Sequence, residues 1–249
     1  MFILSTLHDP EGRFLPLIKK VREKLVVYPN QIIIAYTKAT DKKVIESLKK
    51  LGCQLVIGGQ WGEARKRALE IALQTETDNF FVCDFDKIFH WLEVAPKELK
   101  EILAKPLPQD FLISGRGPKV FSTYPFSWQK TEIITNYLVS KVIGFQVDVL
   151  AATFLFNRRA AKVMLNNSRE KSWGACVEWP LLVHQTGLKI GYQEVRGLTW
   201  EDPDRFKKEI KKSGGLKKWQ TINYDSLEEW EKRIDFLSIM FRVFKRFQN

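Results

Sequence analysis

Two patterns of apolar residues alternate along the first 90 positions of the chain. Continuous apolar runs, typical of strands buried on both faces, are separated by segments in which apolar residues recur every three or four positions, as in a helix. Repeated strand and helix units of about 25 residues predict a mostly parallel central sheet with helices on both faces. The expected strands are 2–8, 31–37, 53–59 and the run that ends at residue 83, and the expected helices begin near Pro10, Val44 and Gly62.

The second half of the chain carries the same patterns less regularly. The expected strands are 111–116, 147–157 and 188–195, and the expected helices are 127–143, a short one from Asn157 and another from Glu178. Beyond residue 205 the chain becomes more basic, aromatic and helical. We therefore expect an α/β domain over residues 1–205, with a helical extension over residues 206–249 packed on it.

The C-terminal helix, expected from Leu227 to Phe247, has an apolar stripe flanked by lysines and arginines. Such a stripe packs against its own domain or a second subunit, or it lies on an anionic membrane surface. Packing on the domain is the expectation. Peripheral membrane contact, which would bring a lipid-linked acceptor to the site, is the alternative.

Composition and charge narrow the class of protein. The content of 45% apolar and 28% charged residues is typical of a globular domain. The formal net charge of +11 attracts phosphates, nucleic acids and anionic lipids, but no nucleic-acid-binding motif accompanies it, so no nucleic-acid partner is expected. The three scattered cysteines fit neither a disulfide framework nor a zinc site. With no export signal, the expectation is a cytoplasmic protein with reduced thiols, with the inner face of the membrane as the alternative location.

Two carboxylates spaced two apart, Asp84 and Asp86, end the strand in the segment FVCDFDKIFHW (81–91). In an extended chain both side chains point to the same side, so we expect them to face one point just past the strand. Two acids on one face repel each other unless a cation lies between them. Mg²⁺ or Mn²⁺ binds through such oxygens together with the phosphates of a substrate. A nucleoside diphosphate is therefore the expected ligand.

At this point the sequence resembles glycosyltransferases of the GT-A fold, specifically the inverting family 2 type that includes polyprenyl-phosphate sugar transferases. The resemblance spans about residues 2–200. It is carried by the segments GEARKRALEIA (62–72), FVCDFD (81–86), ISGRGPKVF (113–121), TNYLVSKVIG (135–144), VDVLAATFLFNRRAAKVM (147–164) and VEWPLLVHQTGLKIGYQEV (177–195). It implies a metal-dependent enzyme that transfers a sugar, with inversion, from a nucleoside diphosphate sugar to an acceptor that is small or linked to a lipid.

The resemblance also implies roles for single residues. Arg65 and Arg116 stand where the family places arginines that contact the nucleotide or its phosphates, and Asp84 and Asp86 are the implied metal ligands, with Asp84 also on the ribose. Glu178 stands where the family places its catalytic base. Asp148, on the segment that carries an aspartate in the family, is the second candidate for that role.

The sequence departs from the family pattern at the end of the first strand, after Asp148, where VLAATF follows, and in the segment 197–210. The first strand ends in LHDPEGRF, where the family usually has Pro followed by a pair such as Asn-Glu, so Asp9 is the candidate to accept hydrogen bonds from the nucleobase or ribose. Trp91, which follows the two aspartates closely, is a candidate to border the sugar pocket. Glu201 and Asp202 form a second acidic cluster after a strand, where enzymes of the GT-A fold often recruit a further metal or diphosphate contact, but Asp202 precedes Pro203, which favours a helix N-cap.

Two other classes of function remain open. A nucleotidyltransferase shares the same kind of sheet, although the loop HDPEGRF lacks the Gly-rich, arginine-containing signature of those enzymes. An inactive domain of this fold, used as a basic binding module or scaffold, also satisfies the pattern.

Overall fold

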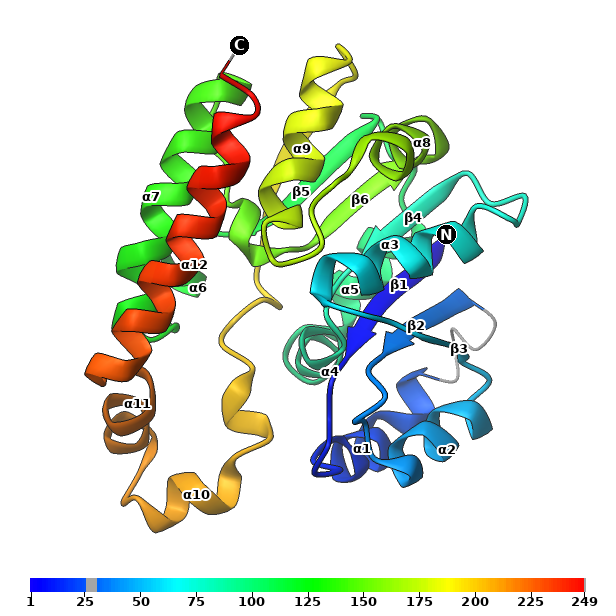
Figure 1. Ribbon diagram of the computed structural model, residues 1–249. Helices are drawn as coiled ribbons and strands as arrows, with labels where there is room; N and C mark the ends of the chain where they lie inside the picture. Colours follow the sequence, from blue (N-terminus) through cyan, green and yellow to red (C-terminus); the bar gives the residue numbers. More distant parts are fainter. Residues whose placement is uncertain (26–30, 249) are drawn as a thin grey trace.

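The computed structural model describes residues 1–25 and 31–248. Seven strands form one sheet: β1 (Phe2–Leu7), β2 (Ile32–Tyr36), β3 (Gln54–Ile57), β4 (Asn79–Val82), β5 (Phe111–Arg116), β6 (Phe154–Asn157) and β7 (Ile190–Val195). Their order in the sheet is β3-β2-β1-β4-β6-β5-β7 (Figure 1). The strand β6 is antiparallel to both of its neighbours, β4 and β5, and the other neighbouring pairs are parallel. The predicted α/β fold with a mostly parallel sheet is confirmed.

The central strands are largely apolar because both faces of the sheet are covered. Along β1, Ile3 packs into the hydrophobic core on one face and Leu4 into the core on the other. Along β4, Phe80 and Phe81 divide between the two cores in the same way. Successive side chains of a strand point to opposite faces, so a strand buried on both faces has to be a continuous apolar run.

Helices on both faces complete the two cores. One core receives apolar side chains from α1 (Phe14–Leu25), α2 (Lys42–Lys50), α4 (Phe85–Val94), α5 (Pro96–Ala104) and α6 (Pro118–Phe121). The other receives them from α3 (Trp61–Ala72), α7 (Phe126–Ile143), α8 (Arg158–Asn167), α9 (Ala175–Gln185) and α12 (Leu227–Lys245). Two short helices, α10 (Lys207–Lys212) and α11 (Leu216–Tyr224), lead from the sheet to α12. The helix starts predicted at Val44 and Asn157 are close to the observed ones, since Asp41 caps α2 and Asn157 caps α8.

The segment 147–157 was expected to be one strand, and that prediction is wrong over most of its length. Only its last four residues form β6, and a 3₁₀ helix, η2 (Val149–Ala151), precedes them. The side chain of Asn136 on α7 accepts hydrogen bonds from the backbone N–H groups of Val149 and Leu150, at 3.0 and 3.3 Å. These bonds satisfy the amides that a ladder would otherwise pair, so an apolar run forms a turn instead of a strand.

The tail returns to the domain and packs on it. In Figure 1, α12 runs side by side with α7, and it also contacts α9. Its Met240, Val243 and Phe244 are buried in the core that it shares with both helices. The boundary at residue 205 stays a prediction. Among residues 1–25 and 31–248, no helix has the length and apolar character that crossing a bilayer requires.

Candidate functional site

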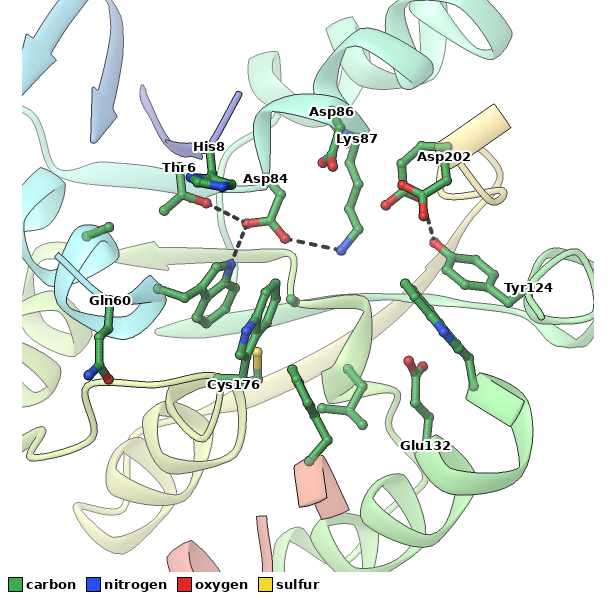
Figure 2. Close-up of a pocket in the computed structure, with 18 of the residues that line it drawn as sticks. Thr6, His8, Gln60, Asp84, Asp86, Lys87, Tyr124, Glu132, Cys176 and Asp202 are labelled. Carbon is green, nitrogen blue, oxygen red and sulfur yellow. Dashed lines mark hydrogen bonds and ion pairs between the residues drawn. The ribbon is translucent and has the colours of Figure 1, made fainter. Parts of the chain in front are cut away.

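A cavity of about 600 Å³ lies at the carboxyl ends of the parallel strands (Figure 2). Leu7 and His8 reach it from the end of β1, Thr37 from the end of β2, and Asp84 from the end of β4. Ligands of open α/β sheets bind at this edge because the strands end there and the loops diverge. The volume is within the range of small-molecule sites, about 300–1,000 Å³.

Asp84 and Asp86 do not share one extended face, as the sequence predicted. The strand β4 ends at Val82, and α4 begins at Phe85, so Asp84 precedes the helix and Asp86 lies in its first turn. A helix turns each successive side chain by about 100°, and the two carboxylates diverge. They therefore belong to different clusters of charge within the same cavity.

Asp84 is buried and surrounded by hydrogen-bond donors. Its Oδ1 accepts from Thr6 Oγ1 at 2.8 Å, Trp61 Nε1 at 3.2 Å and Arg65 Nη2 at 2.8 Å, and Lys87 Nζ lies 3.3 Å from Oδ2. Burial alone would raise the pKa of Asp84, but the charges of Arg65 and Lys87 outweigh burial and lower the pKa to about 2. Asp84 is thus an ionised anchor for two buried cations.

Asp86 lies close to the second acidic pair of the sequence, Glu201 and Asp202. Carboxylate oxygens of Asp86, Glu201 and Asp202 lie within 4.8 Å of one another. The prediction that Asp202 caps a helix is wrong, because Asp202 is the first residue of the 3₁₀ helix Asp202–Asp204 and not its N-cap. Its Oδ2 accepts a hydrogen bond from Tyr224 at 2.7 Å instead. Asp86 and Glu201 are 115 positions apart in the sequence, and only the fold brings them together.

Two cations, Arg205 and Lys87, border the acidic cluster. The guanidinium of Arg205 pairs with Asp202 and lies 3.4 Å from Asp86 Oδ2. Lys87 lies between Asp84 and the side of the cavity that carries Asp202 (Figure 2). Burial, together with the charges of Asp86 and Asp202, raises the pKa of Glu201 to about 8 although Lys87 opposes the shift. Three carboxylates of this kind fit a divalent cation such as Mg²⁺ or Mn²⁺, whose charge would favour the ionised form of Glu201.

Arg116 and Asp148 form a buried pair at another wall of the cavity. Asp148 accepts hydrogen bonds from the backbone N–H, Nε and Nη2 of Arg116, at 2.9, 2.7 and 2.9 Å, and from Asn136 Nδ2 at 2.7 Å. Arg116 Nη2 also donates to Glu132 Oε2 at 2.6 Å. Arg116 and Glu132 line the cavity, whereas Asp148 lies behind the arginine. Asp148 holds Arg116 in place, and its role as the second candidate for the catalytic base stays a prediction.

Glu178 is also placed away from the cavity. Helix α9 begins at Ala175, and the Glu178 carboxylate accepts from Ser168 Oγ at 2.6 Å and from the backbone N–H groups of Arg169 and Glu170, at 3.1 and 3.0 Å. Arg246, after the end of α12, lies 3.1 Å from its Oε1. The side chain is 2% exposed. Through these contacts Glu178 holds the loop at Arg169 and Glu170 and, by way of Arg246, the end of the C-terminal helix.

The remaining predicted residues, Asp9, Trp91 and Arg65, are buried and held by contacts within the fold. The carboxylate of Asp9 accepts from the backbone N–H groups of Arg13 and Phe14, at 2.8 and 2.9 Å, and thereby begins α1. Trp91 is fully buried in the core and donates to Glu98, so the prediction that it borders the sugar pocket is wrong. Arg65 is buried beneath Trp61, its guanidinium 3.6 Å from the ring, and it acts on the cavity through Asp84.

Comparison with solved structures decides the fold family. Glucosyl-3-phosphoglycerate synthase from Mycobacterium tuberculosis is 15% identical over 78% of this chain and 70% of that chain, with a TM-score of 0.51. The structure of that enzyme in complex with Mn²⁺, uridine diphosphate and phosphoglyceric acid is 15% identical over 77% of this chain and 67% of that chain, with a TM-score of 0.50.

The chain has a GT-A-like, nucleotide-diphospho-sugar transferase fold. A cytidylyltransferase from Leptospira borgpetersenii is 14% identical over 100% of this chain and 96% of that chain, with a TM-score of 0.45. No protein-family model matches the sequence, and no curated protein matches it either.

Other residues of the cavity wall come from parts of the chain that the sequence did not single out. Trp61 stacks on Trp173 with ring centroids 4.4 Å apart, and Phe236 of α12 packs against Trp173 at 5.4 Å. Arg233 of α12 lies over the ring of Trp128, 3.6 Å from its centroid. Aromatic residues at helical spacing signal core packing as often as a binding wall, so the sequence held no distinguishing signal for these residues.

Proposed function

We propose that the protein is a metal-dependent glycosyltransferase that transfers a hexose or similar sugar from a nucleoside diphosphate sugar to an acceptor hydroxyl. The observation that carries the proposal is the convergence of Asp86, Glu201 and Asp202 within 4.8 Å in the cavity at the strand ends. The fold supports it, since the mycobacterial enzyme of similar fold has Mn²⁺ and uridine diphosphate bound.

In this proposal Asp86, Glu201 and Asp202 hold the cation, and Asp84 does not. A bound Mg²⁺ or Mn²⁺ would neutralise the diphosphate that leaves as the bond to the sugar breaks. Asp84 instead fixes the ammonium group of Lys87, whose Nζ also donates to the carbonyl of Ala151 at 3.1 Å. Lys87 and Arg205, both in the wall of the cavity, are positioned to pair with phosphate oxygens.

The general base has to be a carboxylate that faces the acceptor. Glu178 and Asp148 are not among the residues that line the cavity, whereas Glu132 of α7 is. Glu132 lies 3.9 Å from Arg233 and is hydrogen-bonded to Arg116, so two cations hold its carboxylate in the wall of the cavity. We assign the base of an inverting transfer to Glu132 on these contacts.

A matched pair of variants separates Glu132 from Glu178. Glu132→Gln is expected to lower kcat by about 10²-fold or more, because a missing general base costs that much. Glu178→Gln is expected to change kcat by less than about tenfold and to lower the free energy of unfolding by about 1–3 kcal/mol, because buried hydrogen bonds are lost. Steady-state kinetics and urea unfolding of both proteins provide the measurements. The reverse pattern of kcat values would assign the general base to Glu178.

Calorimetric titration tests the donor site directly. UDP, GDP, CDP and dTDP and their sugars are titrated into the protein with and without Mn²⁺. One nucleotide class is expected to bind with a metal-dependent increase in affinity of at least about tenfold, since the cation contributes several kcal/mol to diphosphate binding at such sites. Failure of every nucleotide to bind would favour the scaffold function.

A further inference from the structure

The outward face of α7 is unusually apolar for a surface helix. Its inward face carries the buried polar residues Ser127, Thr131, Glu132 and Thr135 beside the cavity, followed by the buried apolar residues Val139 and Ile143 in the core. Its outward face carries seven exposed residues, and each of them is apolar, aromatic or lysine: Phe126, Lys130, Ile133, Ile134, Tyr137, Lys141 and Val142. A solvated helix normally places its charged and polar residues on the outward face.

The exposed side chains of this face are large and follow one another at helical spacing. Phe126 is 54% exposed, Ile133 58% and Tyr137 59%, and they recur at intervals of seven and four residues. Ile134 and Val142 beside them are each 40% exposed. Phe145, just beyond the end of the helix, continues the stripe at 40% exposure. A contiguous apolar surface of this kind marks an interaction site.

The two lysines of the face lie over its aromatic rings. Lys130 Nζ is 5.0 Å from the centroid of Phe126, and Lys141 Nζ is 5.4 Å from the centroid of Tyr137. The only carboxylate of α7, Glu132, is buried on the opposite side. The outward face of α7 is therefore apolar and positively charged, without a compensating acid of its own.

The neighbouring helix α12 shows the contrast. Its exposed apolar residues Leu227, Ile234 and Phe241 recur every seven positions, but the acids Glu228, Glu231 and Asp235 and several basic residues of the same helix are exposed as well. Mixed charges of this kind are typical of a face that meets water. The membrane contact that the sequence suggested for the C-terminal helix has better support on α7, which lies beside it (Figure 1).

We infer that the outward face of α7 docks on an anionic lipid surface. The apolar side chains would enter the boundary between headgroups and acyl chains, while Lys130 and Lys141 pair with anionic headgroups. A second copy of the chain packed on the same face by two-fold symmetry would bring four ammonium groups together, since α7 offers no exposed acid to receive them. The charge of the whole chain, +11, has the sign that an anionic surface attracts.

Docking through this face would place the cavity close to the lipid. Trp128, Thr131 and Glu132 on the opposite side of α7 line the cavity. One helix, about 10 Å across, would therefore separate the headgroups from the acidic and aromatic walls. The inference does not depend on the proposed function, because the docking face and the cavity are on opposite sides of the helix.

Co-sedimentation with vesicles tests the inference without an activity assay. Vesicles of phosphatidylcholine alone are compared with vesicles that contain about 30% phosphatidylglycerol, at low and high salt. The wild-type protein is expected to bind the anionic vesicles and to lose most of this binding at high salt. The variant Ile133→Ser/Tyr137→Ser is expected to lower the partition coefficient by at least about tenfold, because two interfacial anchors are lost. Lys130→Glu/Lys141→Glu is expected to lower it at least as much.

Ile234→Ser on α12 is the matched control, since Ile234 is 59% exposed, like Ile133 and Tyr137, but lies on the charged helix. It is expected to bind vesicles like the wild type. All of the substituted side chains are exposed, so the urea midpoints of the variants should stay near that of the wild type. Absence of wild-type binding, or equal binding by the α7 variants, would overturn the inference. A wild-type dimer that Ile133→Ser/Tyr137→Ser dissociates in analytical ultracentrifugation would also overturn it, and would make the face a subunit interface.

Discussion

Asp86→Asn is expected to lower sugar transfer by about 10²- to 10³-fold or more while the protein remains folded. The substitution removes one of three carboxylates whose oxygens lie within 4.8 Å of one another, and a divalent cation held by two acids and an amide binds more weakly. Asp86 is only half-buried and lies 3.4 Å from a single cation, Arg205, so the fold depends on it little. The measurements are kcat/KM as a function of Mn²⁺ concentration and direct titration of Mn²⁺ by calorimetry.

Asp84→Asn is the control, because it changes the other acid of the same sequence motif. This variant is expected to lose about 3 kcal/mol or more of unfolding free energy, since Arg65 and Lys87 would remain buried without their carboxylate. It should still bind Mn²⁺ in the fraction that is folded. If Asp86→Asn binds Mn²⁺ as tightly as the wild type, the acidic cluster is not the metal site.

Asp148→Ala is expected to lower the free energy of unfolding by about 3–5 kcal/mol, because it leaves a buried guanidinium without its main partner. Asp148 receives three hydrogen bonds from Arg116, whose side chain is 1% exposed. Urea unfolding measures the loss. Asp78→Ala removes a carboxylate that is 82% exposed and 3.8 Å from Arg158, and this control should cost no more than about 1 kcal/mol.

The contribution of Asp148 also has a predicted pH dependence. Burial alone would raise its pKa, but the charge and hydrogen bonds of Arg116 outweigh burial and lower the pKa below the usual 3.8. A carboxyl group whose pKa is lower in the folded state stabilises the protein above its unfolded pKa, and that stabilisation is lost as the pH falls through the folded pKa. The difference between wild type and Asp148→Ala should therefore be constant near neutral pH and shrink below about pH 3.8. Equal stability of the two proteins at pH 7 would show that Asp148 does not anchor Arg116.

The sheet was predictable because its physical signal is local. Continuous apolar runs such as Ile32–Tyr36 arise only where both faces are covered, and the helices between them repeat every three or four residues. The turn at Val149 was not predictable, because its backbone partner is the side chain of Asn136 on another element. The apolar sequence of the segment itself does not indicate such a partner.

The site was predictable only in part, for a related reason. The sequence located Asp86 at a strand end, where an acid meets solvent and ligand. It did not distinguish a carboxylate that faces the cavity from one that receives backbone N–H groups, and Glu178 and Asp9 proved to be of the second kind. Both kinds are acidic residues near the start of a helix, and only the tertiary fold distinguishes them. The joining of Asp86 with Asp202 likewise depends on the path of the chain after β7.

Product analysis separates sugar transfer from its nearest alternative most directly. The protein is incubated with Mn²⁺ and either nucleoside diphosphate sugars or nucleoside triphosphates with sugar phosphates, and the release of nucleoside diphosphate and of pyrophosphate is measured. A glycosyltransferase releases nucleoside diphosphate from one sugar nucleotide, slowly to water and faster with an acceptor, and Asp86→Asn abolishes the release. Pyrophosphate release from a triphosphate and a sugar phosphate, with every sugar nucleotide left intact, would contradict sugar transfer and make the protein a nucleotidyltransferase.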